Sequence, residues 1–298
     1  MKAGYVAVVG RPNVGKSTLM NAMLGQPVAA VSPKPQTTRR NQLGIYTNEK
    51  MQVIFVDTPG LHLEHNKLGA LMNEQALAAL EDGDVILFLV DASQAPDEED
   101  RLLAAKIEGR ASRQPVVLAV NKIDLLAPER MAARRAEFEA LAKATLVAEI
   151  SGTQGKGVAG LMEALGELLP EGEPFYPAEQ VTDLYERQIA ADLVRAAALQ
   201  HLRDEVPHGI DVRIDQFTER GEKGARIEAT IFVEREAHKG IVIGAGGAMI
   251  KQIGQTARKA IEAMNQRKIY LELRVKVSKD WRNDPKTLER FGYARRKE

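Results

Sequence analysis

Cysteine is absent from the 298 residues of the chain. Disulfide frameworks and thiolate metal sites are therefore excluded, and a reducing compartment, the cytoplasm, is the expected location. Long apolar runs are also missing: the longest, such as Val85–Val90, fall far short of the roughly 20 residues that span a bilayer. The N-terminus, residues 1–4, lacks the apolar block of a signal peptide. We expect a protein without a transmembrane segment.

The chain also lacks a net charge, because 41 Lys and Arg residues balance 41 Asp and Glu residues. The balance differs along the chain. Residues 1–179 carry 18 basic and 23 acidic side chains, a net of −5, whereas residues 180–298 carry 23 basic and 18 acidic side chains, a net of +5. The C-terminal excess favours a polyanionic partner, although on charge alone a solvated basic face is an equally good explanation.

Short apolar segments alternate with helical stretches over the first 170 residues. The predicted strands are Tyr5–Val9, Leu43–Tyr46, Gln52–Val56, Val85–Val90, Val116–Val120 and Leu146–Ile150. This alternation predicts an α/β fold in which helices flank a mostly parallel sheet. The turn at residues 47–50 is too short for a parallel crossover, so the second and third strands should be antiparallel and the sheet mixed.

Residues 170–177 contain three prolines and a glycine, which disfavour both helix and strand. We interpret residues 171–180 as a linker between a first domain, residues 1–170, and a second, residues 181–298. The second domain begins with an amphipathic helix around Leu184–Val206. Two alternating strands, a helical segment, a glycine-rich turn, a longer helix and a final strand follow, so the predicted order is α-β-β-α-turn-α-β and the class is α+β.

A phosphate-binding loop follows the first predicted strand and precedes a helix. Its residues are Gly10, Arg11, Pro12, Asn13, Val14, Gly15, Lys16 and Ser17. The glycines allow backbone N–H groups to face phosphate oxygens, and the helix N-terminus adds partial positive charge. Lys16 is the expected ligand of the β- and γ-phosphates, and the Ser17 hydroxyl is an expected Mg²⁺ ligand.

Asp57, Thr58, Pro59 and Gly60 form a second motif at the carboxyl end of the third strand. A carboxylate in this position can hold Mg²⁺, while the Gly60 N–H meets the γ-phosphate. Together with the phosphate loop, this motif predicts a γ-phosphate sensor.

The polar loop between these two motifs, residues 32–40, contains Thr37 and Thr38. A threonine there can ligate Mg²⁺ only when the γ-phosphate orders the loop, which would make the loop a switch. We favour Thr38. The predicted metal ligands are therefore Ser17, Thr38 and Asp57.

Guanine specificity is predicted by Asn121, Lys122 and Asp124 after the fifth strand. The Asp124 carboxylate can accept hydrogen bonds from both N1–H and N2–H of guanine, whereas adenine has no donor at either place. Ser151 and Gly152, at the end of the sixth strand, fit a backbone contact to guanine O6. Many such proteins have alanine at the position of Gly152, but the group that matters belongs to the backbone.

Leu61 occupies the position where signalling GTPases carry a water-orienting glutamine. Leucine has no donor or acceptor, so we expect intrinsic hydrolysis to be slow or to use another group. Asn13 could help bind K⁺ near the developing charge, as a further hypothesis. The predicted catalytic residues are Lys16, Thr38, Gly60 and Asn13.

These motifs and residues 36–40, joined to a basic C-terminal domain, make the chain resemble the Era family of bacterial ribosome-assembly GTPases over its whole length. The second domain resembles a type II KH module, in which a GXXG turn clamps a nucleic-acid backbone. The predicted RNA-binding residues are Lys239, Gly244, Ala245, Gly246, Gly247, Lys251 and Arg258. Basic or polar residues are commoner at the two central positions of the turn, so Ala245 and Gly246 lower the expected affinity.

The resemblance implies a GTP-binding switch that binds small-subunit ribosomal RNA near its 3′ end and assists 30S subunit biogenesis, with GTP/GDP and Mg²⁺ as cofactors. The resemblance also suggests that the protein contacts the cell membrane peripherally. Exposed basic residues are the only support for this in the sequence. Trp281, Arg282 and the tail at residues 295–297 are further candidate RNA contacts, although a single tryptophan is more often a packing residue.

Two alternatives remain open from the residues. One is a GTP-controlled protein or membrane adaptor that does not bind RNA, and the other is a kinase that uses the same phosphate loop. No obligate oligomer is predicted.

Overall fold

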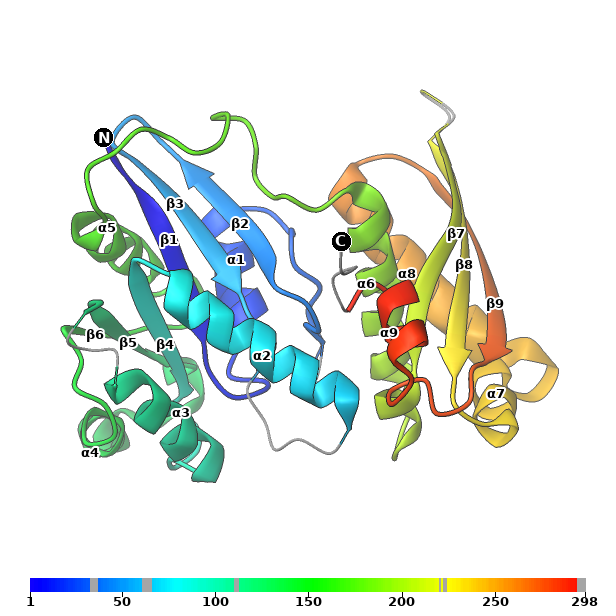
Figure 1. The fold of residues 1–298 in the computed structure, drawn as a ribbon, viewed down its shortest axis with the longest axis horizontal. Helices are drawn as coiled ribbons and strands as arrows, with labels where there is room; N and C mark the ends of the chain where they lie inside the picture. The colour runs from blue at the N-terminus through cyan, green and yellow to red at the C-terminus, as the bar shows by residue number, and fades with distance from the viewer. Residues whose placement is uncertain (33–36, 61–65, 110–112, 220, 222–223, 294–298) are drawn as a thin grey trace. The chain divides into compact units, whose positions relative to one another are not determined.

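The computed structural model describes residues 1–32, 37–60, 66–109, 113–219, 221 and 224–293 (Figure 1). The chain forms two compact units. The first contains residues 1–29, 38–64 and 72–183, and the second contains residues 30–37, 65–71 and 184–298.

A six-stranded mixed sheet in the order β2-β3-β1-β4-β5-β6 forms the centre of the first unit. Its strands are β1 (Lys2–Val9), β2 (Gln42–Thr47), β3 (Met51–Asp57), β4 (Val85–Asp91), β5 (Val116–Asn121) and β6 (Leu146–Glu149). β2 and β3 are antiparallel, as the short turn between them predicts, and the other neighbouring strands are parallel. The predicted mixed sheet is confirmed. Every parallel strand therefore ends at the same edge of the sheet, where the nucleotide motifs follow.

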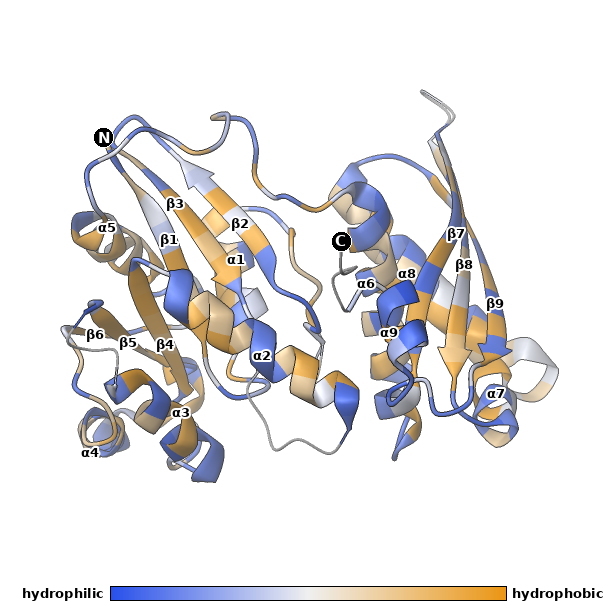
Figure 2. Cartoon of the chain, in the orientation of Figure 1, coloured by the Kyte–Doolittle hydropathy of each residue, from blue (hydrophilic) through white to orange (hydrophobic). Residues whose placement is uncertain are grey.

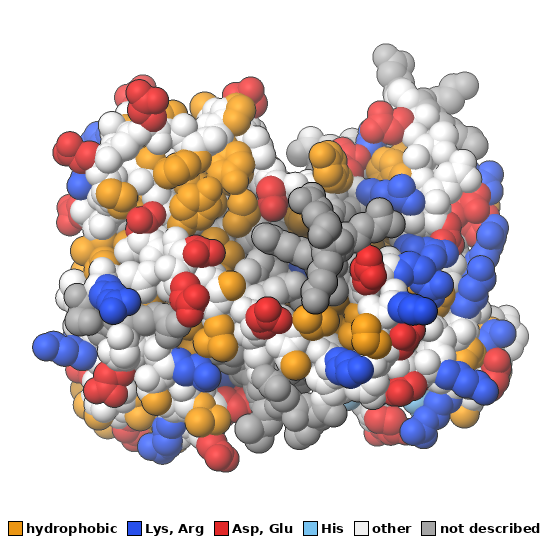
Figure 3. Space-filling view, in the orientation of Figure 1, with side chains coloured by type: hydrophobic (Ala, Val, Ile, Leu, Met, Phe, Trp, Pro, Cys, Tyr) orange, Lys and Arg blue, Asp and Glu red, His pale blue; other side chains and the backbone are white. Residues whose placement is uncertain are grey.

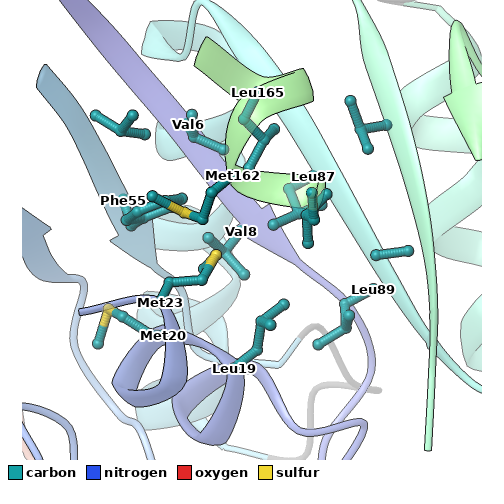
Figure 4. Close-up of a cluster of buried hydrophobic side chains, with 14 of the residues drawn as sticks. Val6, Val8, Leu19, Met20, Met23, Phe55, Leu87, Leu89, Met162 and Leu165 are labelled. Carbon is teal, nitrogen blue, oxygen red and sulfur yellow. The ribbon is translucent and has the colours of Figure 1, made fainter. Parts of the chain in front are cut away.

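Helices cover both faces of this sheet. They are α1 (Lys16–Leu24), α2 (Lys67–Asp82), α3 (Glu98–Glu108), α4 (Pro128–Glu139) and α5 (Val158–Leu168), with a short 3-10 helix η1 (Ile123–Leu125). One apolar core joins the strands to α1 and α5 through side chains such as Leu19, Phe55 and Leu165 (Figure 4). A second core, on the opposite face, joins them to α2, α3 and α4 through Leu80, Ile107 and Phe138. Burial on both faces holds the strand ends, and hence the motifs, in fixed positions.

The second unit contains a three-stranded sheet in the order β7-β8-β9, with β7 and β8 antiparallel and β8 and β9 parallel. The chain order is α6 (Glu186–His201), η2 (Val206–Gly209), β7 (Asp211–Glu219), β8 (Ala225–Val233), α7 (Glu236–Ile243), η4 (Ala245–Gly247), α8 (Ala248–Asn265), β9 (Ile269–Val277) and α9 (Pro285–Arg290). The predicted α-β-β-α-turn-α-β order is confirmed. Apolar residues of α6 and α8 bury one face of the sheet.

Hydropathy distinguishes the two sheets (Figure 2). The central strand β4 is apolar from Val85 to Val90 and fully buried, whereas β9 alternates apolar and polar residues. Continuous hydrophobicity is typical of parallel strands covered on both faces, and alternation is typical of a sheet with one open face. The open face of the second unit therefore consists largely of polar side chains.

The segment that follows α5 is held against the first unit. Isolated antiparallel bridges join Glu171 to Lys2 and Thr182 to Gly44 on the β2 edge. Gln52, which is fully buried, accepts hydrogen bonds from the backbone N–H groups of Phe175 and Tyr176. The prolines prevent a regular strand here, but this segment is anchored by isolated contacts over much of its length.

Candidate functional site

The phosphate loop is shaped by two backbone conformations that few residues adopt. Asn13 has φ 64° and Gly15 has φ 103°, both in the left-handed region. A Cβ atom on Gly15 would lie 2.5 Å from Asn121 Nδ2, and one on Gly10 would lie 2.4 Å from the Leu89 carbonyl oxygen. Glycine is therefore required at both ends of the loop for it to pack against β4 and the Asn121 side chain.

Lys16 begins α1 and points back across the loop. Its Nζ donates hydrogen bonds to the carbonyl oxygens of Gly10 at 2.8 Å and Arg11 at 3.0 Å. Burial lowers the pKa of Lys16 to about 8, against a smaller opposing effect of Asp57. An anion bound in the loop would raise this pKa and favour the charged form of the lysine.

Ser17, Thr38 and Asp57 meet at one point, although they come from three separate segments. Ser17 Oγ lies 3.0 Å from Thr38 Oγ1 and donates to Asp57 Oδ2 at 2.8 Å, while Thr38 Oγ1 lies 3.3 Å from the same carboxylate oxygen. The other oxygen, Asp57 Oδ1, is buried without a hydrogen-bond partner among the described residues. Three hard oxygen donors and one unsatisfied carboxylate oxygen fit a bound Mg²⁺.

The raised pKa of Asp57 is also consistent with a bound cation. Burial raises the pKa of Asp57, and Lys16, Ser17 and Thr38 only partly oppose this effect. A divalent cation beside the carboxylate would favour the ionised form and remove the cost of burying it.

The Asn121 side chain connects two loops of the nucleotide site. Its Nδ2 donates to the Val14 carbonyl oxygen at 2.8 Å, and its Oδ1 accepts from the Gly152 N–H at 3.0 Å. The Gly152 N–H, which we expected to contact guanine O6, therefore donates its hydrogen bond to Asn121 within the protein. Ser151 is fully buried, and its Oγ accepts from the Gln154 N–H at 3.1 Å. Asn121 acts here as a brace between the phosphate loop and this segment.

Lys122 and Asp124 occupy the surface side of the same motif. Lys122 has φ 64°, and its Nζ donates to the Asn13 carbonyl oxygen at 2.7 Å. Asp124 lies in η1 and is exposed, as a carboxylate that accepts hydrogen bonds from a base must be. The geometry leaves Asp124 accessible to a ligand.

The Asp57–Gly60 motif closes against the phosphate loop. Thr58 Oγ1 donates to the Val8 carbonyl oxygen at 2.8 Å, and Pro59 is buried. A Cβ on Gly60 would lie 2.7 Å from the Pro12 nitrogen, so only glycine allows this approach. Leu61, which bears on the hydrolysis rate, lies outside the described residues.

Arg11 belongs to the phosphate loop, but its side chain is bound to another segment. Its Nε donates to Asp100 Oδ2 at 3.2 Å, and its Nη2 donates to Gln94 Oε1 at 3.0 Å, so its side chain is bound to the region around the start of α3. Sequence reasoning missed Asp91, Gln94 and Asp100. The available signal was the position of Asp91 at the end of an apolar strand, the same signal that identified Asp57.

Two of the predicted RNA-binding residues, Lys251 and Arg258, line a groove in the second unit. It has a volume of about 440 Å³ and runs between α8 and the edge strand β9. Lys251 and Arg258 line it together with Gly254, Gln255 and residues 270–273. Lys239 lies on α7, where it pairs with Glu236 at 4.0 Å. The structure therefore places two of the three predicted cations in the groove lining.

The GXXG turn immediately precedes α8. Gly244, Gly246 and Gly247 have φ values of 73°, 57° and 78°, so each adopts a left-handed or related conformation. A Cβ on Gly244 would lie 2.8 Å from the Met249 nitrogen. Ala245 and Gly246 are exposed at the tip. Such a turn permits close approach of a nucleic-acid backbone.

Trp281 is a packing residue. Its side chain is fully buried, its Nε1 donates to the Gly209 carbonyl oxygen at 2.9 Å, and it packs against Phe291 and Tyr293. The prediction that Trp281 could contact RNA is therefore wrong, because its ring has no accessible face. Arg282 pairs with Glu234 at 2.6 Å, and the tail at residues 295–297 lies outside the described residues.

Basic side chains gather over the open face of the β7-β8-β9 sheet, interspersed with acidic ones (Figure 3). Arg226 and Arg274 pair with Glu228 and Glu272 at 2.8 to 3.2 Å. Within the described part of the chain, no helix has the length and apolar character needed to cross a membrane.

Comparison with known proteins assigns both units. Residues 5–122 match the family described as 50S ribosome-binding GTPase, and residues 205–282 match the KH domain family. A protein named GTPase Era from Halothermothrix orenii is 43% identical over 292 residues, which cover 98% of this chain and 98% of that protein. GTPase Era from Lactobacillus helveticus is 43% identical over 295 residues, covering 99% of this chain and 97% of the relative.

Solved structures agree with these relatives. A crystal structure of an Aquifex aeolicus Era variant bound to GDP and AlF₄⁻ is 39% identical, has a TM-score of 0.91 and aligns over 99% of this chain and 100% of that chain. A crystal structure of Era in complex with MgGDPNP and nucleotides 1506–1542 of 16S ribosomal RNA has the same identity, coverage and TM-score.

Proposed function

Because the chain belongs to the Era family of GTPases, we propose that it is a GTP-operated switch that binds small-subunit ribosomal RNA near its 3′ end and assists assembly of the 30S subunit in the cytoplasm. Its enzymatic reaction is the hydrolysis of GTP to GDP and phosphate. The proposal assigns the nucleotide site to residues 1–170 and the RNA site to residues 181–298, with residues 171–180 as the linker.

The nucleotide half of the proposal rests on the cluster of Ser17, Thr38 and Asp57. Thr38 belongs to the loop that we expect to switch, whereas Ser17 and Asp57 belong to fixed elements. Because all three would hold the same Mg²⁺, the position of the loop would depend on whether the metal and nucleotide are bound. Lys16 would bind the β- and γ-phosphates, and Gly60 would present its N–H to the γ-phosphate. Ser17, Thr38 and Asp57 would hold Mg²⁺, which when bound would supply positive charge to offset the charge that develops during transfer.

Guanine recognition would depend on Asp124, with Asn121 bracing the site behind it. Asp124 would accept N1–H and N2–H of the base, and the methylene stem of Lys122 would cover the ring. We extend the proposal to K⁺ through Asn13 in the phosphate loop. Equal hydrolysis rates in K⁺ and Na⁺ would remove that extension.

The single observation that carries the RNA half is the groove between α8 and β9, which is lined by Lys251 and Arg258 of α8, the helix that directly follows the glycine turn. Its cations face a space of suitable size for single-stranded nucleotides, and the exposed turn admits a phosphate backbone. The relative solved with nucleotides 1506–1542 of 16S ribosomal RNA supports the choice of RNA.

A charge change at the turn tests this proposal. In Gly246→Asp, the added Cβ meets open space, and aspartate tolerates left-handed φ better than most residues. Gly240→Asp is the matched control, because it adds the same charge on α7, also into open space. Binding of a 16S 3′-terminal RNA is measured with the non-hydrolysable GTP analogue and with GDP, and anionic vesicles form a third arm.

We expect Gly246→Asp to weaken RNA binding about tenfold or more by placing a carboxylate against the phosphate backbone, and Gly240→Asp to change it less than about threefold. Binding should be tighter with the GTP analogue than with GDP. Unchanged RNA binding in Gly246→Asp would refute the proposed RNA site at the turn and groove. Binding to vesicles without binding to RNA would favour the adaptor alternative.

A further inference from the structure

Asp91 is a buried aspartate at the carboxyl end of β4 and belongs to none of the nucleotide motifs. β4 lies between β1 and β5 in the sheet. The phosphate loop follows β1, and the guanine motif begins at Asn121, the residue that pairs with Asp91 in register. The topology therefore places one carboxylate between the two loops that hold the nucleotide.

Each loop directs one cationic side chain to this carboxylate. Lys122 Nζ lies 2.7 Å from Asp91 Oδ2, and Arg11 Nη2 lies 4.0 Å from the same oxygen. The N–H and Oγ of Ser93 donate to the other oxygen at 2.9 Å and 2.6 Å, which fixes the orientation of the carboxylate. Burial opposes the ionisation of Asp91, but the hydrogen bonds from Lys122 and Ser93 overcome it and lower the pKa of Asp91.

Arg11 has a second anchor at the start of α3. Its Nε is 3.2 Å from Asp100 Oδ2 and 3.4 Å from Asp97 Oδ2. Asp97 and Asp100 form the capping box of α3, so the anchor is rigid. The Arg11 side chain, only 11% exposed, is held by the carboxylates of Asp91, Asp97 and Asp100.

We propose that Asp91 is a positioning residue for the nucleotide, which holds Lys122 and Arg11 so that the guanine loop and the phosphate loop keep one fixed relative geometry. Lys122 Nζ also donates to the Asn13 carbonyl oxygen, which completes a chain of contacts from Asp91 through Lys122 to the phosphate loop. Asp91 acts through these two side chains and needs no contact with the nucleotide. Its removal would leave two cations without their shared partner at the base of the site.

The test variant is Asp91→Asn in the full-length protein. Asparagine has nearly the same shape and can still accept the hydrogen bonds from Ser93, but it lacks the negative charge. We expect KM for GTP and Kd for GDP to rise about tenfold or more, because a charge-assisted hydrogen bond to Lys122 is lost. The kcat at saturating GTP should stay within about twofold, since Ser17, Thr38 and Asp57 are untouched.

Glu98→Gln is the matched control. Glu98 lies in the first turn of α3 beside Asp97, its side chain is exposed, and the substitution removes one negative charge from the same region. We expect its KM, Kd and kcat to equal those of the unmodified protein. Thermal unfolding of both variants without nucleotide measures stability separately.

Arg11→Ala is a second test variant, in which KM for GTP can be measured even if Asp91→Asn does not fold. We expect it to raise KM, and the double variant with Asp91→Asn to raise KM by less than the product of the single effects, because both act through one contact. The proposal is overturned by an unchanged KM in either single variant, by a loss confined to kcat, or by an equal loss in Glu98→Gln. No RNA is present, so the result is independent of the RNA-binding proposal.

Discussion

The nucleotide site buries its polar side chains, whereas the groove of the C-terminal unit exposes them. Lys16, Asp57 and Asn121 are 7%, 0% and 2% exposed; Lys16 is held by hydrogen bonds across its own loop, and the other two by hydrogen bonds to other segments. Lys251 and Arg258 are exposed on a single helix face. The first arrangement fits a small ligand whose every polar atom is recognised, and the second fits a polymer attracted by charge and shape.

This difference follows from how the two sheets are built. Strands buried on both faces end at fixed points, so side chains that follow them can be positioned to within fractions of an ångström. The β7-β8-β9 sheet is covered on one face, and its groove runs along an open edge beside a glycine turn. We therefore expect single substitutions to act strongly and cooperatively in the nucleotide site, and weakly and additively in the groove.

The largest effect is expected for Asn121→Ala. It removes the brace between Val14 and Gly152 and leaves a buried carbonyl and a buried N–H without partners, which costs on the order of 3 kcal/mol. GDP affinity, measured by fluorescence titration, should fall about 100-fold or more. Gln154→Ala, an exposed neighbour, is the control and should bind GDP normally. A small loss of GDP affinity in Asn121→Ala would contradict the proposed difference between the nucleotide site and the groove.

Smaller effects are expected for Lys251→Ala and Arg258→Ala in the groove. Each should weaken RNA binding about three- to tenfold, and the slope of log affinity against log salt should become shallower by about 0.7 for each lost phosphate contact. The two losses should add, because exposed cations act independently. Lys259→Ala, on α8 outside the groove lining, should change neither quantity. Strong non-additivity would show that the groove is built like the nucleotide site.

Burial of Lys16 predicts a pH dependence for nucleotide binding. Its pKa is lowered to about 8 in the free protein, and only the protonated form attracts phosphate. GDP affinity should therefore fall about fourfold as pH rises from 7 to 8.5, with proton uptake on binding that calorimetry in two buffers detects. The free protein should instead gain stability as pH rises from about 8 towards the unfolded pKa of 10.5, because the unfolded state then binds more protons. A flat affinity across this range would contradict the prediction.

The sequence predicted the elements well because local patterns determine them. The short turn predicted at residues 47–50 implied an antiparallel pair, which β2 and β3 form. The nucleotide motifs were found because each follows a strand. The chain's membership of the Era family and its GTPase fold, both anticipated by that resemblance, are confirmed by the relatives.

Contacts between distant segments could not be predicted in the same way. Arg11 and Asp100 are 89 positions apart, and nothing local indicates that the arginine of a phosphate loop is directed to α3. The same holds for Gln52, which holds the backbone of a segment 124 positions later, and for Trp281, whose burial depends on Gly209 and Tyr293. Such contacts depend on the assembled sheet order, which periodicity does not give.

The smallest expected effect concerns Gly152. A Cβ there would lie 3.4 Å from the Leu19 backbone and 3.7 Å from Asn121 Oδ1, which are ordinary contacts, and its φ lies outside the left-handed range. Gly152→Ala should therefore stabilise the nucleotide-free protein by about 0.4–1 kcal/mol, because alanine restricts the unfolded chain.

Gly157→Ala, five residues later, is the opposite case. Its φ is +75°, and a Cβ would lie 2.4 Å from the Glu149 carbonyl oxygen, so the substitution should destabilise the protein by more than about 1 kcal/mol. Urea unfolding of the two variants measures the sign of each change in the free energy of unfolding. If Gly152→Ala also destabilised the protein, the segment behind the guanine site would be packed more tightly than these distances indicate, and the contrast with the open groove would become sharper.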